Sequence, residues 1–187
     1  MTQVFAQAGI GPRTLDAFEV HIRKRSLAVG EYLIRQGECA PDLYFLTEGL
    51  VKMFYITAEG KEFVKSFIAE GQFTGSLSSQ VEAGESPFSV ACLEPVKVEV
   101  LAFDQIKGMI DEDPHLLRFL YEFFFALALK KERREFEFLC LTPEMRYRLF
   151  VQDNPHIVQR VTQADIARYL GITPVALSRI RGRARTS

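Results

Sequence analysis

The stretch that most constrains this chain is HLLRFLYEFFFALALKKERREFEFL, residues 115–139, which contains neither glycine nor proline. It follows Asp113-Pro114, where Asp can cap the free backbone N–H groups and Pro at the first helical position loses no hydrogen bond. About 25 residues at a rise of 1.5 Å each predict a helix of roughly 37 Å. So long a helix divides the 187-residue chain, and we expect two unequal domains around it.

The first half of this predicted helix has apolar residues on all sides, more than one face toward its own domain could bury. A 4-3-4 spacing, the seam of a helix pair, is formed by Leu116, Leu120, Phe123 and Leu127. We expect these four residues to form a homodimer interface. A central helix buried in one large domain is the alternative, and the charged second half, residues 130–137, is expected to be solvated.

The region before the long helix has the sequence pattern of a β-domain. A short helix is predicted over residues 15–25, and after it short runs rich in Val, Ile, Phe and Tyr alternate with glycines from Leu27 to about Phe103. Such regular turn signals indicate an antiparallel sandwich or barrel. In LVKMFYITAEGKEFVKSFI two alternating runs flank Glu59-Gly60, which predicts a hairpin, and APDLYFLTEG and VKVEVLAF predict further strands. A β-domain without any ligand remains open.

The region after the long helix contains several signals for the start of a helix. Thr142-Pro143 precedes EMRYRLFVQD, TQAD at residues 162–165 has capping-box spacing, and Thr173-Pro174 follows the stop at Gly171. Two short helices joined by a glycine-containing turn predict a helix-turn-helix, for which a structural helical hairpin is the alternative. Its expected core consists of Ile166, Leu170, Ile172, Leu177 and Ile180, and Ala167 is expected where the two helices cross closely.

Charge is unevenly distributed along the chain. The whole chain carries −1, but residues 156–187 hold six arginines (160, 168, 179, 181, 183 and 185) against the single acid Asp165. This +5 end on a body of −6 suggests that only the C-terminal end meets a polyanion.

Several classes of protein are disfavoured by what the sequence lacks. No apolar run approaches the ~20 residues that span a bilayer, and the first 20 residues lack a basic patch followed by an apolar core. We therefore expect no membrane partner and a cytoplasmic location. Cys39, Cys92 and Cys140 are too scattered for a disulfide framework, and neither they nor the dispersed histidines have the spacing of a metal site. We therefore expect no metal and no cofactor.

Three stretches of the chain resemble the Crp/Fnr family of bacterial transcription regulators. They are GEYLIRQGECAPDLYFLTEGLVKMFYITAEGKE, then FTGSLSS with SPFSVACLEPVKVEVL, and RVTQADIARYLGITPVALSRIRGR. The resemblance implies an α+β fold with an antiparallel, jelly-roll-like β-roll, a long dimerisation helix and a helix-turn-helix. The implied domains are a cyclic-nucleotide-binding-like sensor at 1–112, the dimerisation helix at 113–141 and the DNA-binding part at 142–187.

The effector segment departs from the family's pattern. Cyclic-nucleotide binders of the family hold the phosphate with a short helix N-terminus, a Glu directly after its Gly and an Arg about ten residues on. Here the Gly is Gly75, but the other two positions are Ser76 and Ser86, and residues 71–96 contain no Lys or Arg. We therefore expect cyclic AMP and cyclic GMP to bind poorly or not at all. Two alternatives stay open: an unidentified small molecule bound at a degenerate site, or a roll that has kept only a structural role. The residues of that site would be Gly75, Ser76, Leu77, Ser86, Pro87 and Phe88.

The resemblance also implies which residues face double-stranded DNA. Arg179 is expected to contact a base, since an arginine can bind guanine through two hydrogen bonds, with Thr173 and Ser178 beside it. Thr162, Gln163, Arg181 and Arg183 are expected at phosphates, with Pro174 and Ala176 on the same open surface. No wing strands are expected after this helix. RNA polymerase is a candidate partner.

Two other classes of function were weighed against a regulator. One is a ligand-binding or interaction module of the same fold that has lost DNA binding, which a DNA titration distinguishes. The other is a cupin-like metal enzyme, but such a site needs histidines on its strands, and residues 27–103 contain none. We expect no enzymatic activity.

Overall fold

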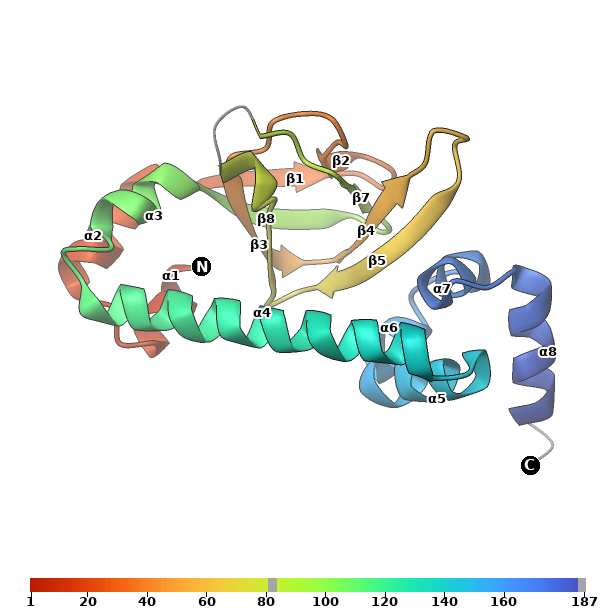
Figure 1. Cartoon of the computed structure of the whole chain (residues 1–187). Helices are drawn as coiled ribbons and strands as arrows, with labels where there is room; N and C mark the ends of the chain where they lie inside the picture. The colour runs from red at the N-terminus through yellow and green to blue at the C-terminus, as the bar shows by residue number, and fades with distance from the viewer. Residues whose placement is uncertain (81–83, 185–187) are drawn as a thin grey trace.

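The computed structural model describes residues 1–80 and 84–184 and contains two four-stranded antiparallel sheets (Figure 1). The first sheet has the order β1-β8-β3-β6 and the second the order β2-β7-β4-β5. Their strands are β1 (Arg23–Leu27), β2 (Tyr32–Ile34), β3 (Asp42–Glu48), β4 (Leu50–Ile56), β5 (Glu62–Ala69), β6 (Phe73–Thr74), β7 (Ser89–Cys92) and β8 (Val96–Ala102). The expected antiparallel β-roll is confirmed.

The main core lies between the two sheets and follows from alternation along the strands. On β8, Val96, Val98 and Val100 are all buried, whereas Lys97 between them is exposed. The predicted hairpin is the pair β4 and β5, joined by a turn in which Gly60 has a φ of +77°. A left-handed conformation of this kind is the one that glycine adopts without strain.

Short helices cover one end of the roll. They are α1 (Thr2–Gln7), α2 (Pro12–His21) and α3 (Phe103–Met109), and Ser78–Gln80 forms one 3-10 turn, η1. The helix predicted over residues 15–25 was placed wrongly, because α2 begins and ends earlier and Arg23 to Arg25 belong to β1. Phe5 and Phe18 from this group are buried against the first sheet, where Phe5 also stacks on Phe73.

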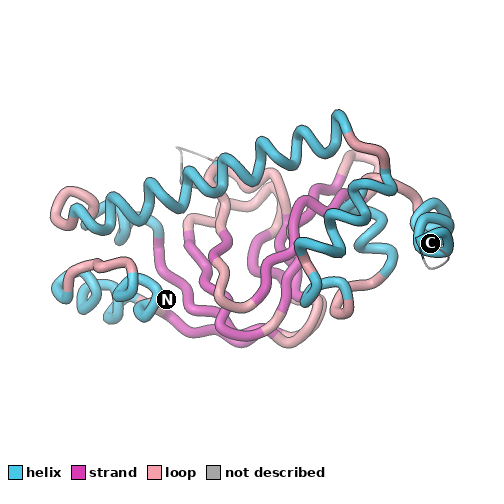
Figure 2. Tube along the Cα trace, turned by 90° about the horizontal axis from the view of Figure 1, so that it is seen from below, coloured by secondary structure: helices cyan, strands magenta, loops and turns pink. Residues whose placement is uncertain are grey.

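The long helix is α4 (Pro114–Cys140), 27 residues that run along the whole roll (Figures 1 and 2). The carboxylate of Asp113 caps it by accepting hydrogen bonds from the N–H groups of His115 at 3.0 Å and Leu116 at 3.4 Å. The same carboxylate accepts a third hydrogen bond from the N–H of Gly11 at 2.9 Å, which ties the start of α4 to α2. The predicted start signal is confirmed.

The predicted dimer seam lies on the side of α4 that faces the chain's own roll. Leu116 and Leu120 are only 0% and 8% exposed because they pack against α1–α3 and the first sheet. Phe123 contacts Phe73 edge-on, and Leu127 lines a cleft toward the roll. Leu116 and Leu120 are therefore buried within one chain, and Phe123 and Leu127 are half-buried.

The second half of α4 is less solvated than expected, because part of it packs on the C-terminal helices. The guanidinium of Arg134 lies 3.8 Å from the centre of the Tyr169 ring and donates a hydrogen bond to the Tyr169 carbonyl. Arg133 pairs with Glu137 on its own helix and with Asp153. These contacts attach the end of α4 to the C-terminal region.

Four helices follow α4 in the described residues and are grouped around its C-terminal end (Figure 1). They are α5 (Pro143–Asp153), α6 (Pro155–Val158), α7 (Gln163–Leu170) and α8 (Pro174–Ala184). As predicted, the hydroxyl of Thr142 caps α5 by accepting a hydrogen bond from the N–H of Met145 at 3.3 Å.

Candidate nucleic-acid interface and effector cleft

The helix pair α7 and α8 has the local structure that its sequence predicts. The Thr162 hydroxyl caps α7 by accepting a hydrogen bond from the N–H of Asp165 at 3.1 Å. Gly171 ends α7 with a φ of +69°, and the Thr173 hydroxyl accepts a hydrogen bond from the N–H of Ala176 at 3.2 Å at the start of α8. The caps fix where both helices begin and how the turn between them bends.

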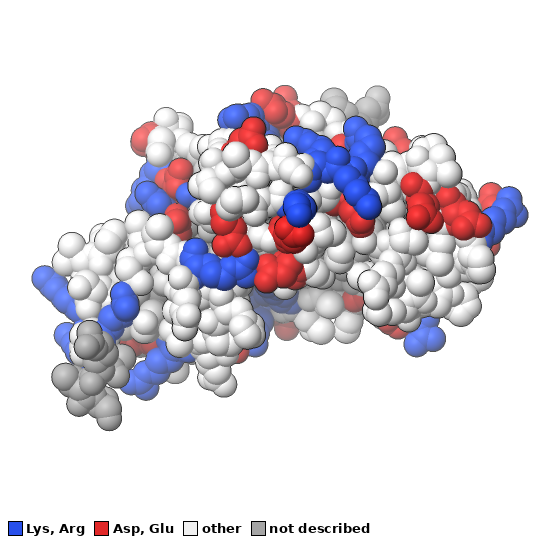
Figure 3. All heavy atoms as spheres, turned by 180° about the vertical axis from the view of Figure 1, so that it is seen from behind, with Lys and Arg blue, Asp and Glu red and all other residues white. Residues whose placement is uncertain are grey.

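The expected DNA-facing residues gather on the open side of this helix pair. All except Ala176, which is half-buried, are exposed: Thr162, Gln163, Thr173, Pro174, Ser178, Arg179, Arg181 and Arg183. Arg183 also lies 3.7 Å from Glu144 on α5. Figure 3 shows basic side chains around this end of the molecule, beside the grey C-terminal residues. Arg185, the sixth arginine of the basic end, lies outside the described residues.

The predicted capping box is only half formed. The Asp165 carboxylate does not return to the backbone at Thr162 but accepts hydrogen bonds from the Thr162 hydroxyl at 2.7 Å and from the ammonium of Lys52 at 3.1 Å. Arg168 lies 3.1 Å from it as well. Burial alone would raise the pKa of Asp165, but Thr162, Lys52 and Arg168 together hold that pKa below its ordinary value. Asp165 therefore links α7 to strand β4.

Two of the six arginines in the basic end face the roll. Arg160 makes a two-bonded ion pair with Glu70 at 3.0 Å and a second ion pair with Glu94. Arg168 pairs with Asp165 and lies 3.7 Å from Glu62 on β5. The +5 count therefore overstates the charge that this end presents outward.

The expected small core of the helix-turn-helix is buried except for Ile172, which is half-buried, and it is shared with the second sheet. Ile166, Ala167, Leu170 and Leu177 are all 0% exposed. They belong to one apolar cluster with residues of β4, β5 and β7, in which the ring of Phe67 lies 5.6 Å from that of Tyr169. The helix-turn-helix is therefore packed on the roll, with α7 against β5 and α8 on the outside.

A cleft of about 1160 Å³ lies between α4, the second sheet and the C-terminal helices. Five of the six expected effector residues line it: Gly75, Ser76, Leu77, Pro87 and Phe88. The sixth, Ser86, lies outside the lining, and its hydroxyl donates a hydrogen bond to the Phe88 carbonyl at 2.8 Å. Ser86 therefore holds the backbone turn that presents Phe88 to the cleft.

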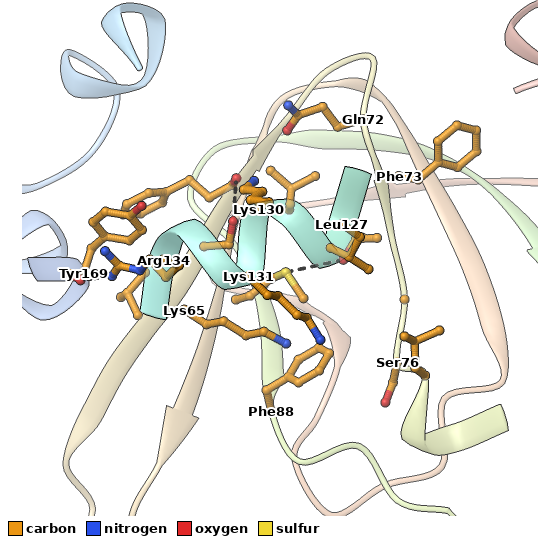
Figure 4. A pocket seen from close by; sticks show the side chains of 18 of the residues that line it. Lys65, Gln72, Phe73, Ser76, Phe88, Leu127, Lys130, Lys131, Arg134 and Tyr169 are labelled. Carbon is orange, nitrogen blue, oxygen red and sulfur yellow. Dashed lines mark hydrogen bonds between the residues drawn. The ribbon is translucent and has the colours of Figure 1, made fainter. Parts of the chain in front are cut away.

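Sequence reasoning missed the cations of this cleft. It considered residues 71–96, which contain no Lys or Arg, whereas the cleft receives Lys65 from β5 and Lys130 and Lys131 from α4 (Figure 4). Burial and the charge of Lys131 lower the pKa of Lys65 to about 8. The alternation of side chains along β5 could have indicated Lys65, because this residue lies between Val64 and Ser66 on a strand of the second sheet.

Two other kinds of site were sought in the part of the chain that the structure describes. Across residues 1–80 and 84–184, no three His, Cys, Asp or Glu side chains are grouped in a way that could hold a metal ion. None of the helices described combines the length and the apolar character needed to cross a membrane.

Comparison with known proteins points to one family. Residues 24–113 match the model of the cyclic nucleotide-binding domain. The cAMP-activated global transcriptional regulator CRP of Salmonella typhimurium is 29% identical over 104 residues, which is 56% of this chain and 50% of that protein. The chain thus matches about half the length of this relative.

Two further comparisons extend over most of the chain. The fumarate and nitrate reduction regulatory protein of Yersinia pestis is 24% identical over 176 residues, 88% of this chain and 70% of that protein. The solved structure of the c-di-GMP responsive global regulator CLP of Xanthomonas campestris superposes with a TM-score of 0.75 at 17% identity, covering 94% of this chain and 92% of the other.

Proposed function

We propose that this chain, which belongs to the Crp/Fnr family of transcription regulators, binds double-stranded DNA as a homodimer and reads it with α8. The observation that carries the proposal is the open face of α8, where Thr173, Ser178 and Arg179 are exposed while Leu177 and Ile180 anchor the other side. An exposed, capped helix of this kind fits the major groove of B-DNA. The homologues are regulators rather than enzymes, and no catalytic residue is assigned.

A titration of labelled DNA from the protein's own upstream region, followed by fluorescence anisotropy, tests this role. Arg179→Ala should reduce the preference for the specific sequence, because a base contact discriminates by about 1–3 kcal/mol. Arg181→Ala should weaken binding to all sequences alike and make the salt slope about one unit shallower.

The matched control is Arg168→Ala, which removes the same charge from the same helix pair. Arg168 pairs with Asp165 on its own helix and with Glu62 on β5, so it faces the roll. Its loss should therefore leave both the sequence preference and the salt slope of DNA binding unchanged. Equal effects of all three substitutions would contradict the assigned roles. DNA binding that is absent at low salt would favour the interaction module over a regulator.

The proposed dimer uses the face of α4 that the roll leaves open. Leu117, Tyr121, Phe125 and Leu129 recur at four-residue intervals and are 54%, 66%, 54% and 50% exposed. The rings of Tyr121 and Phe125 stack with centres 5.9 Å apart, so the stripe is already ordered in one chain. A second copy packed along this stripe would bury a row of large apolar groups that water otherwise surrounds.

The proposal includes a sensor that does not hold cyclic nucleotides in the usual way. The hydroxyl of Ser76 has no hydrogen-bond partner among the described residues, and Ser86 is engaged with the backbone of Phe88. Neither residue supplies the carboxylate or the guanidinium that the family's pattern has there. Calorimetric titration with cyclic AMP and cyclic GMP should give no heat of micromolar binding, and tight binding of either would contradict this part.

A further inference from the structure

The cleft beside α4 holds a concentration of positive charge that the protein itself does not neutralise. Lys65, Lys130 and Lys131 all line it, and within residues 1–80 and 84–184 no carboxylate lies within ion-pair distance of any of them. Glu62, three residues before Lys65, pairs with Lys52, and Glu137 pairs with Arg133. Glu135 also lines the cleft, but no ion pair among the described residues joins it to any of the three lysines. The lysines therefore have room for an external anion.

Lys65 lies over an aromatic ring of the cleft, close enough to Lys131 to be affected by its charge. The Lys65 ammonium lies 4.0 Å from the centre of the Phe88 ring and 5.7 Å from that of Tyr55. In Figure 4 the side chain of Lys131, from α4, points to the same ring. A cation over an aromatic face gains only about 1 kcal/mol, which does not offset the repulsion between two ammonium groups in a partly dry space. An anion between them would remove that repulsion.

The walls around these charges are mainly apolar. Phe88 and Tyr55 lie on one side, and Leu127 from α4 lies on the other. The Ser76 hydroxyl also belongs to the lining, on a residue only 1% exposed, and has no hydrogen-bond partner among the described residues. An unpaired buried hydroxyl is costly, so it is an independent sign that a ligand group completes the site.

We propose that the cleft takes an amphipathic organic anion, with a ring-containing apolar body between Phe88 and Leu127 and an acidic group between Lys65 and Lys131. This inference rests on the proposed function and specifies its effector class. It differs from a phosphate held at the turn of Gly75 to Leu77, because the cations come from β5 and α4. A carboxylate or a sulfonate offers the shared chemistry, a single compact negative charge on an apolar skeleton.

Two fluorescent probes of nearly the same skeleton test the inference without DNA. 1-Anilinonaphthalene-8-sulfonate carries one negative charge, and N-phenyl-1-naphthylamine is its neutral counterpart. With the purified full chain, Lys65→Met and Lys131→Met should each weaken binding of the sulfonate about tenfold, because each removes one charge-assisted contact. Binding of the neutral amine should change less than twofold.

The matched control is Lys61→Met, which removes a lysine next to β5 that also lies over an aromatic ring, 4.7 Å from the centre of the Phe63 ring. Phe63 lines the cleft, but Lys61 does not. This substitution should leave the affinity of both probes unchanged. Lys131 is exposed on the surface of α4, so its substitution keeps the test valid even if Lys65→Met unfolds the roll.

Several outcomes would overturn the inference. They are no binding of the sulfonate to the unsubstituted protein, equal loss of both probes in the lysine variants, and an equal effect of Lys61→Met. The proposed function would fail in a different way. In that case the anisotropy titration would show no DNA binding, while binding of the sulfonate probe would still depend on the lysines. Lysine-independent probe binding with DNA binding intact would reject only the effector class.

Discussion

Replacing Lys52 by Met tests the ion pair that joins the helix-turn-helix to the roll. The Lys52 ammonium lies 3.1 Å from the Asp165 carboxylate, and the two side chains are 14% and 6% exposed. At that distance and an effective dielectric constant of 20, the attraction is about 5 kcal/mol before desolvation is counted. Desolvation of the two ions costs several kcal/mol, so the net interaction is much smaller.

The expected cost of the substitution follows from what Asp165 keeps. Removing one partner of a buried ion pair typically costs 3–5 kcal/mol, because the other charge is left alone. Here the Thr162 hydroxyl and Arg168 still contact the carboxylate after Lys52 is lost. We therefore expect Lys52→Met to lower the free energy of unfolding by about 2 kcal/mol.

A double-mutant cycle in urea measures the interaction itself. Lys52→Met, Asp165→Asn and the double variant are unfolded at one fixed protein concentration, with circular dichroism and tyrosine fluorescence as two probes of the same transition. The coupling energy between the two positions should be about 2 kcal/mol. Agreement between the two probes is needed, because a helix-turn-helix that unfolds separately would give two transitions.

An exposed pair of similar geometry provides the control. Lys97 and Glu48 lie 2.9 Å apart, but their side chains are 59% and 61% exposed. Exposed pairs contribute about 0–1 kcal/mol because water and salt screen them. A coupling energy for Lys52 and Asp165 no larger than that of Lys97 and Glu48 would refute the reasoning from burial.

The pH dependence of the same cycle gives a second check. Since the folded state lowers the pKa of Asp165, the stability it contributes is complete above the ordinary pKa of about 4. That contribution is lost as the pH falls through the lower pKa of the folded protein. The difference in stability between the unsubstituted protein and Asp165→Asn should thus be constant from pH 5 to 8 and shrink toward pH 3.

Three further substitutions test the dimer stripe, the helix turn and the cleft. Phe125→Glu should shift the protein toward the monomer in sedimentation experiments, whereas Glu122→Gln, which borders the stripe but removes no apolar group, should not. Gly171→Ala should lower the free energy of unfolding by about 1–2 kcal/mol, because the residue has a φ of +69° and a Cβ there would lie 2.9 Å from the ring of Phe138. An unchanged midpoint of urea unfolding would contradict this prediction. Because folding lowers the pKa of Lys65 to about 8, the unsubstituted protein should gain stability over Lys65→Met as the pH rises from 8 to 10, and a flat difference would show that the lysine is not desolvated.

Local signals in the sequence predicted where the helices begin. Asp113-Pro114, Thr142-Pro143 and Thr173-Pro174 each place a capping side chain directly before a residue that needs no backbone donor. These features depend on a few neighbouring residues and were confirmed. The alternation of β8 and the turn at Gly60 are equally local, and they were confirmed for the same reason.

The orientation of α4 could not be obtained in this way. Its first half carries two apolar stripes, and spacing shows that stripes exist but not what each one covers. Leu116 and Leu120 were assigned to a partner, but the N-terminal helices and the first sheet bury them. The other stripe, with Tyr121 and Phe125, remains open because it lies on the far side of the helix. Only the packing of segments that are distant in the sequence determines which of the two stripes is buried and which is open.

The charge of the effector cleft escaped prediction for a related reason. Whether a stretch can hold an anion depends on the charges that surround it in space, and residues 71–96 contribute none of the cations near Phe88. Lys65 arrives from the preceding strand, and Lys131 arrives from a helix 43 positions after Phe88. The opposite error occurred at the C-terminal end, where Arg160 and Arg168 were counted toward DNA although they pair with acids on the roll or on α7. A local count of charge is therefore reliable only where the neighbouring segments carry no opposite charge within reach.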